Sequence, residues 1–140
     1  MENPKDDQHF LQNHHGDVVS TVNFSGKPEA AFIYYTLDEE SNFYFITKNQ
    51  TRKAKNLEIN KSVAIVISDE ELMQTLQMEG TASLVEDSKL TIHIMNTWLE
   101  RNITNKENWP PPLFKLNKGS LLIFKVKIDW THLSDFRWAH

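Results

Sequence analysis

The chain has 140 residues, enough for one domain with its own hydrophobic core. It contains no cysteine, which excludes disulfides and thiolate metal sites, and its net charge of −4 argues against bulk binding to nucleic acid. Because the first residues are polar and acidic and no apolar run approaches the length of a membrane span, we expect a soluble, cytoplasmic protein.

The first elements predicted along the chain are a helix and three strands. Residues 1–16 are expected to hold an N-terminal helix, with Asn3 as its cap, Pro4 at its first position and Gly16 at its end. Apolar residues between turn signals then predict three strands, over residues 17–26, 29–37 and 42–47.

A helix and two further strands are predicted in the middle of the chain. The helix consists of good helix formers, begins after Thr51 and stops at Asn60. The apolar run 62–68 predicts a strand that is buried on both faces. Rough alternation over residues 72–86 predicts a long strand with a bulge at Gly80.

The last part of the chain is predicted to form a helix, a loop and a closing strand. Residues 87–102 have Asp87 as a helix cap and apolar residues at helical spacing, and three consecutive prolines make 102–118 a Pro-rich loop. Residues 120–130 alternate cleanly as a strand, followed by a tail or a short last strand. The whole chain, 1–140, is thus expected to be a single, mainly β domain whose six strands pair antiparallel and close into a barrel.

A basic segment lies between two of the predicted strands. From Thr47 to Lys61 there are five basic residues and one acid, so the segment carries +4 and the remainder of the chain −8. Arg52 and Lys53 fall in the first turn of a predicted helix, where free amide groups and the helix dipole favour anions. Cations there reduce stability unless an anion neutralises them, so we predict a phosphate site with Thr51 as a hydroxyl donor. A solvated helix face is the alternative interpretation.

The motifs around this segment occur in a characteristic order. The stretches FYFIT, KNQ, TRK, AKNLEINKS and VAIVI follow one another, and LQMEGTASLVEDSKL comes next. This order resembles the FMN-binding split-barrel superfamily, which includes pyridoxamine 5′-phosphate oxidase and the bacterial general stress proteins. The resemblance covers residues from Val18 to Trp98 and, in outline, Ser120–Trp130. It implies a six-stranded split β-barrel with flanking helices and FMN at the interface of a two-fold homodimer.

The resemblance also implies which residues bind the FMN phosphate and which lie beside the flavin. Ile46 and Thr47 would lie beside the edge of the flavin ring or the ribityl chain. Thr51, Arg52 and Lys53 would hold the phosphate group.

Three further positions are implied with a less direct correspondence. Lys27 could reach the same phosphate, depending on the length of the preceding hairpin. Thr75 stands where the oxidase branch has a glutamine near the ring. Trp98 or Trp109 of the second subunit could cover the flavin.

The chain departs from the oxidase branch at the substrate site. The run EAAFIYY replaces an oxidase segment that ends in a substrate-binding lysine, and the oxidase's C-terminal histidine and arginine are missing. We therefore expect no oxidation of pyridoxamine phosphate. A related haem-degrading branch uses a C-terminal histidine as a ligand, and His132 and His140 lie late in this chain.

These patterns leave three functions open. The first is a flavin-dependent oxidoreductase with a small-molecule substrate, using FMN or, alternatively, the deazaflavin F420. The second is a non-catalytic flavin-binding or stress-response protein. The third has no cofactor and uses the basic segment to bind an acidic partner or a phosphate. We assign no catalytic acid or base, and we expect no metal site because His9 and His14 lie off the spacing that aligns two ligands on a helix.

Overall fold

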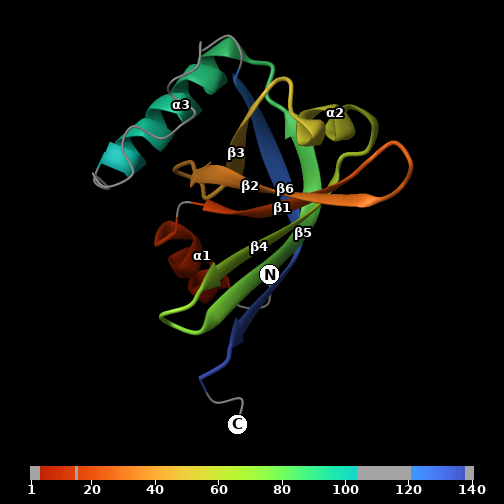
Figure 1. The fold of residues 1–140 in the computed structure, drawn as a ribbon. Coiled ribbons are helices and arrows are strands. Elements are labelled where there is room, and N and C mark those ends of the chain that lie inside the picture. The colour runs from red at the N-terminus through yellow and green to blue at the C-terminus, as the bar shows by residue number, and fades with distance from the viewer. Residues whose placement is uncertain (1–3, 15, 104–120, 138–140) are drawn as a thin grey trace.

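The computed structural model describes residues 4–14, 16–103 and 121–137 of the chain. Six strands form a closed barrel in the order β1-β2-β3-β6-β5-β4, and every neighbouring pair is antiparallel (Figure 1). The elements are α1 (Pro4–Gln12), β1 (Gly16–Val22), β2 (Pro28–Leu37), β3 (Phe43–Lys48), α2 (Arg52–Ile59), β4 (Ser62–Asp69), β5 (Gln74–Leu84), α3 (Ser88–Ile103) and β6 (Leu121–Asp135). The predicted mainly β fold with six antiparallel strands is confirmed.

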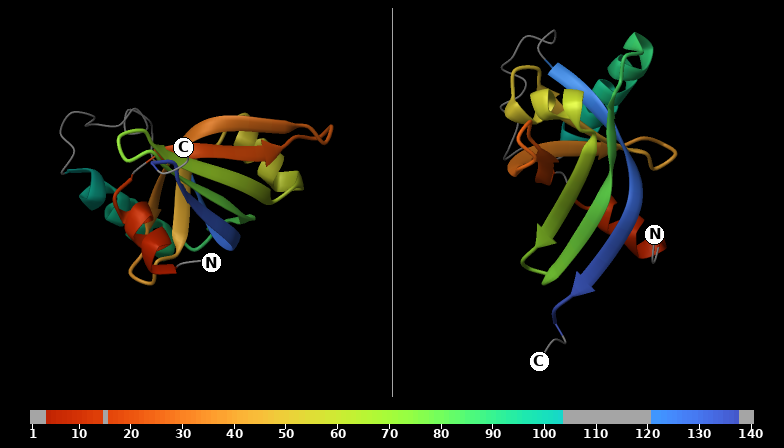
Figure 2. Two further views of the ribbon diagram at one scale, coloured as in Figure 1. Left: turned by 90° about the horizontal axis from the view of Figure 1, so that it is seen from below. Right: turned by 90° about the vertical axis from the view of Figure 1, so that its right-hand side faces the viewer.

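The three helices surround the barrel without entering it. In Figures 1 and 2, α1 and α3 lie on one side of the barrel, whereas α2 lies on the other side, next to the β1–β2 hairpin. None of the described helices is both long and apolar enough to cross a membrane.

Alternation along β3 supplies side chains to two separate apolar cores. Phe43 and Phe45 belong to the core that fills the barrel. Tyr44 and Ile46 belong to a second core on the outer side of the strand, beneath α3. Because side chains of successive strand residues point to opposite faces, a strand covered on both faces is buried throughout. Residues 43–47 are accordingly all buried.

The apolar run of β4 was predicted to be buried on both faces, and this was wrong. Val63, Ile65 and Ile67 are buried in the barrel, but Ala64 is exposed and Val66 only half-buried. The prediction failed because Ala64 and Val66, which point outward, are also apolar. The alternation of apolar and polar residues that marks a strand with one exposed face is therefore not visible in this sequence.

Two boundaries differ from those expected. The N-terminal helix ends at Gln12, and Gly16 is the first residue of β1. The residues directly after 130 do not form a separate strand, because β6 continues without interruption to Asp135. Most of the predicted Pro-rich loop, from residue 104 to residue 118, lies outside the described residues.

The predicted irregularity at Gly80 is present in the pairing of β5 with β6, but the extra, unpaired residue is Asp129 on β6 and not a residue of β5. The pairing register between β5 and β6 shifts between Glu79 and Gly80. A Cβ atom on Gly80 would come within 2.3 Å of the backbone oxygen of Lys127, so only glycine permits the two backbones to approach this closely.

The helix that follows β5 begins and packs as predicted. The Asp87 carboxylate accepts hydrogen bonds from the backbone amides of Lys89 at 2.9 Å and Leu90 at 3.2 Å, which confirms the predicted cap. Ile94 and Trp98 of α3 are fully buried against the sheet.

Side chains from four elements fix α1 to the lower part of the barrel. The hydroxyl of Thr131 donates to the Asp7 carboxylate at 2.6 Å, and both residues are buried. The Tyr35 hydroxyl donates to the backbone oxygen of Leu11 at 2.7 Å. His14, just after the helix, stacks on the Phe10 ring and lies 2.8 Å from the Asp69 carboxylate.

Candidate functional site

Two threonine hydroxyls lie where β3 ends and α2 begins. Thr51 is the N-cap of α2, and its Oγ1 accepts a hydrogen bond from the Ala54 amide at 3.3 Å. The same hydroxyl donates to the backbone oxygen of Lys48 at 3.0 Å. Oγ1 of Thr47 lies 3.2 Å from Oγ1 of Thr51. The turn therefore places two hydroxyl groups next to the positive end of the helix dipole.

Lys53 is a half-buried cation in the first turn of this helix. Burial lowers the pKa of Lys53 first, and the neighbouring positive charge of Lys48 lowers it further. No ion pair within the described ranges involves either lysine, and the first turn of α2 contains no acid. The helix start thus carries positive charge that the described residues leave uncompensated.

The neighbouring cation, Arg52, is already paired. Its guanidinium donates to the carboxylate of Glu29 on β2, which sequence reasoning missed. Glu29 also accepts from the side-chain amides of Asn23 at 3.0 Å and Asn56 at 2.9 Å. These two hydrogen bonds are the largest causes that lower the pKa of Glu29. The sequence feature that could have indicated this pair is an acidic residue, Glu29, directly after the Lys27–Pro28 turn.

The other predicted residues around this cluster lie in different surroundings. The Ile46 side chain is buried under α3, in the same core as Ile94 and Trp98. Since Trp98 is fully buried there, its ring is not available to cover a ligand in a second subunit without repacking of α3. Lys27 is exposed in the β1–β2 turn, where its backbone amide donates to the Asn23 side chain at 3.0 Å.

Thr75 lies far from the cluster within one chain. Pairing with β6 sets Thr47 opposite Leu122, near the start of that strand, and Thr75 opposite Ser134, near its end. The structure therefore does not bring Thr75 to the turn that contains Thr51. Trp109 lies outside the described residues.

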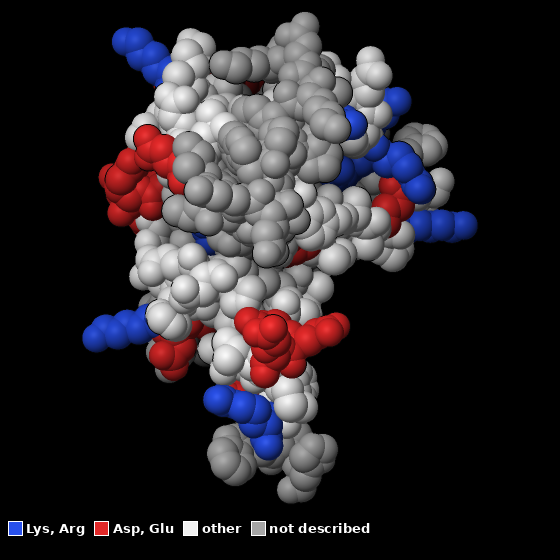
Figure 3. Space-filling model, turned by 60° about the vertical axis from the view of Figure 1, so that its left-hand side comes forward, with Lys and Arg blue, Asp and Glu red and all other residues white. Residues whose placement is uncertain are grey.

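Surface charge is distributed unevenly around the barrel. In Figure 3, basic side chains gather at the right-hand edge, while acidic side chains gather on the left and below. The basic residues of the β3–α2 junction and the nearby hairpin are Lys27, Lys48, Arg52, Lys53 and Lys55.

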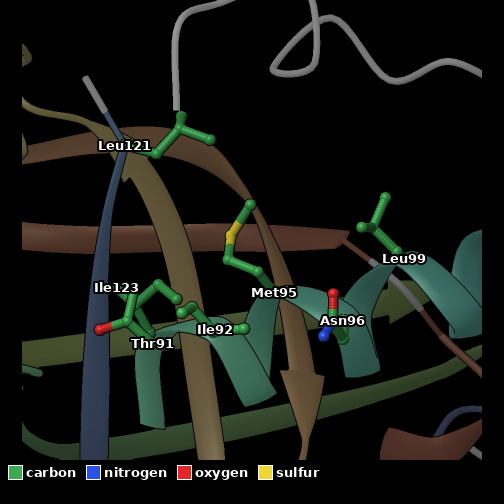
Figure 4. Close-up of a pocket in the computed structure, with 7 residues that line it drawn as sticks. All are labelled: Thr91, Ile92, Met95, Asn96, Leu99, Leu121 and Ile123. Carbon is green, nitrogen blue, oxygen red and sulfur yellow. The ribbon is translucent and has the colours of Figure 1, made fainter. Parts of the chain in front are cut away.

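A small apolar pocket lies at the same end of β3 and β6. It has a volume of about 140 Å³ and lies between α3 and the start of β6 (Figure 4). Leu121 and Ile123 of β6 form one wall, and they pair with Lys48 and Ile46 of β3. The α3 side of the pocket consists of Thr91, Ile92, Met95, Asn96 and Leu99.

The histidines within the described ranges form no metal site. No group of three or more potential metal ligands occurs among the described residues. His93 is exposed on α3 and pairs with Glu39. His132 stacks on Trp130 on β6, with ring centroids 6.1 Å apart.

The closed six-stranded antiparallel barrel with its three flanking helices is consistent with a split-barrel fold. Residues 4–133 match the sequence profile of the pyridoxamine 5′-phosphate oxidase family. The chain belongs to this family. No curated protein sequence matches the chain significantly.

Solved structures with the same fold share little sequence with this chain. Conserved hypothetical protein Rv2991 from Mycobacterium tuberculosis is 19% identical with a TM-score of 0.79, over 96% of this chain and 86% of that one. General Stress Protein 26 from Bacillus anthracis is 22% identical with a TM-score of 0.70, over 95% and 94%. The haem storage protein HutZ from Vibrio cholerae is 21% identical with a TM-score of 0.69, over 94% and 92%. At these identities the likeness concerns the fold.

Proposed function

We propose that this protein binds FMN through Thr51, Arg52 and Lys53 and acts as a flavin-dependent oxidoreductase on a small-molecule substrate. The observation that carries the proposal is Lys53, a half-buried cation at a helix start that forms no ion pair with any of the residues the structure describes. A phosphate group placed there would neutralise the lysine and accept hydrogen bonds from the free amides of the first turn.

Family membership favours a flavin over other phosphate compounds. When bound, FMN would supply the hydride or electron transfer. The described residues of the junction would anchor its phosphate: Lys53 by charge, and Thr51 and Thr47 by their hydroxyl groups. These residues bind and orient; none of them is assigned a proton-transfer role.

We further propose a homodimer with FMN at the subunit interface. An exposed apolar row on the barrel surface supports it: Val18 is 39% exposed and Phe32, its partner in register on β2, is 59% exposed. Val18 also pairs with Val66 on β4. A shallow groove continues this surface to Trp130 on β6. Exposed apolar surface of this kind commonly marks a protein interface.

Comparison of FMN with riboflavin tests the phosphate site directly. Riboflavin lacks only the phosphate, so its affinity should be about 10- to 100-fold lower than that of FMN, the usual contribution of a charged hydrogen-bonded group. Fluorescence quenching of each flavin by the purified protein gives both dissociation constants. Equal affinities, or no binding of either flavin, would contradict the proposal.

Two further measurements separate the alternatives within this fold. The first is the reduction of bound FMN by NADH, NADPH or other electron donors. If the protein binds FMN but no donor reduces it, the protein is a non-catalytic flavin-binding protein. The absorbance spectrum of the protein purified from cells distinguishes FMN from the deazaflavin F420 and from haem, the ligand in the name of one similar structure.

A further inference from the structure

Glu29 places a negative charge inside the proposed anion site. Its side chain is 16% exposed, and its carboxylate accepts hydrogen bonds from three side chains on two different segments. The donors are Asn23 in the β1–β2 turn, Asn56 within α2 and Arg52 at the start of α2. Glu29 is therefore fixed in position, and the lowered pKa keeps it ionised at neutral pH.

Arg52 is held much less firmly than its partner. The Arg52 side chain is 80% exposed, and within the described ranges its guanidinium pairs with Glu29. Asn56 is anchored independently, because its amide also donates to the Thr21 hydroxyl at 2.9 Å. Glu29 thus keeps two neutral donors if Arg52 turns away, whereas Arg52 gains a new partner when an anion arrives.

We propose that Glu29 is a specificity-determining residue that competes with the ligand phosphate for Arg52. This role depends on the proposed phosphate site at the start of α2. When no ligand is present, the Glu29 carboxylate is paired with the Arg52 guanidinium. A bound phosphate must either share Arg52 with Glu29 or displace Glu29 from it. Because it holds Arg52, Glu29 weakens the binding of every phosphate ligand, and it weakens the binding of a diphosphate more, since the larger charge of a diphosphate gains more from a free guanidinium. The site is therefore matched to ligands with a single terminal phosphate.

A double-mutant cycle tests whether Glu29 acts through Arg52. Glu29→Gln removes the charge and keeps a side chain of the same length, so FMN affinity should rise about fivefold, as expected for one partly exposed charge pair. Riboflavin affinity should not change. In an Arg52→Ala background, Glu29→Gln should alter FMN affinity by less than about twofold. Glu58→Gln on the exposed face of α2 is the control for net charge.

The opposite results are equally clear. If Glu29→Gln lowers the affinity for FMN and riboflavin together, Glu29 is only a structural support of the hairpin and the competition is refuted. The competition is also refuted if Glu29→Gln raises FMN affinity by the same factor in the Arg52→Ala background as in the wild type. Circular dichroism and the melting temperature establish that each variant is folded.

Inorganic phosphate and pyrophosphate separate this inference from the flavin proposal. Both are titrated into the wild type and Glu29→Gln while the backbone amide signals of Thr51 and Lys53 are followed by NMR. Tighter binding in the variant, with a larger gain for pyrophosphate, supports the role of Glu29 even if FMN does not bind. If neither anion nor FMN binds to either protein, both proposals fail.

Discussion

At the scale of single residues, Lys53 and Lys55 form a natural pair for comparison, since both lie on α2 but only Lys53 is half-buried. Lys53→Ala should weaken FMN binding about 10- to 100-fold, because a charged partner of the phosphate is removed. Lys55→Ala should change the affinity by less than about twofold, because Lys55 is exposed. Flavin fluorescence titration measures both, and equal losses in the two variants would show that only general positive charge matters.

Asp17 is a second residue with an unusual environment. It is 4% exposed on the barrel side of β1, and neither carboxylate oxygen has a hydrogen-bond partner among the described residues. Burial alone raises the pKa of Asp17 from its ordinary value of 3.8 to about 8. Between these pH values the unfolded chain ionises and the folded chain does not, so the free energy of unfolding falls as pH rises.

Asp17→Asn should remove this pH dependence. The variant should be more stable than the wild type by roughly 2–4 kcal/mol at pH 7, and the difference should vanish at pH values below the ordinary pKa of an aspartate. Urea unfolding of both proteins across the acidic and neutral range measures it. A stability difference that does not change with pH would mean that Asp17 finds a partner in solution.

At the scale of elements, the bulge of β6 opposite Gly80 of β5 offers a prediction about one glycine. Gly80→Ala should lower the free energy of unfolding by about 2–4 kcal/mol, because the new Cβ would meet the backbone oxygen of Lys127 and the two strands must separate. Gly26→Ala, where only the positive φ of 80° is unfavourable, should lower it by about 1 kcal/mol. Chemical unfolding of both variants measures the two losses in free energy of unfolding. A smaller loss for Gly80→Ala than for Gly26→Ala would show that the strands at the bulge move apart easily.

Elements were predictable wherever the local signal and the tertiary structure agree. The side chains of Thr51 and Asp87 accept hydrogen bonds from amides in the turn that follows each of them, so both caps could be predicted from sequence alone. Gly80 marked the register shift with β6, but the extra residue on β6 could not be located from the sequence of β5. The burial of β4 could not be predicted either, because which face is covered depends on elements distant in sequence. The same distinction applies to the candidate site. The junction residues are close in sequence and could be predicted together, whereas the Glu29–Arg52 pair joins residues 23 positions apart and could not.

At the scale of the whole molecule, the apolar row on the barrel surface predicts the state of assembly. The wild type should be a dimer of chains of 16.4 kDa, and Val18→Glu should convert it to a monomer, because burial of an unpaired charge at an interface is unfavourable. Ile59→Glu, which changes an exposed apolar residue at the end of α2, is the matched control. Light scattering after size-exclusion chromatography gives the masses, and a dimeric Val18→Glu variant would place the interface elsewhere.

The position of β6 in the chain has a consequence for how the molecule folds. This strand pairs with β3 on one side and β5 on the other, so it closes the barrel, yet it is the last of the strands in the described part of the chain. During synthesis, the backbone groups of β3 and β5 that pair with β6 therefore remain unpaired until β6 has left the ribosome. Many of the contacts that stabilise the protein are thus distant in sequence, which favours slow folding and a nascent chain that is prone to aggregation until β6 is in place.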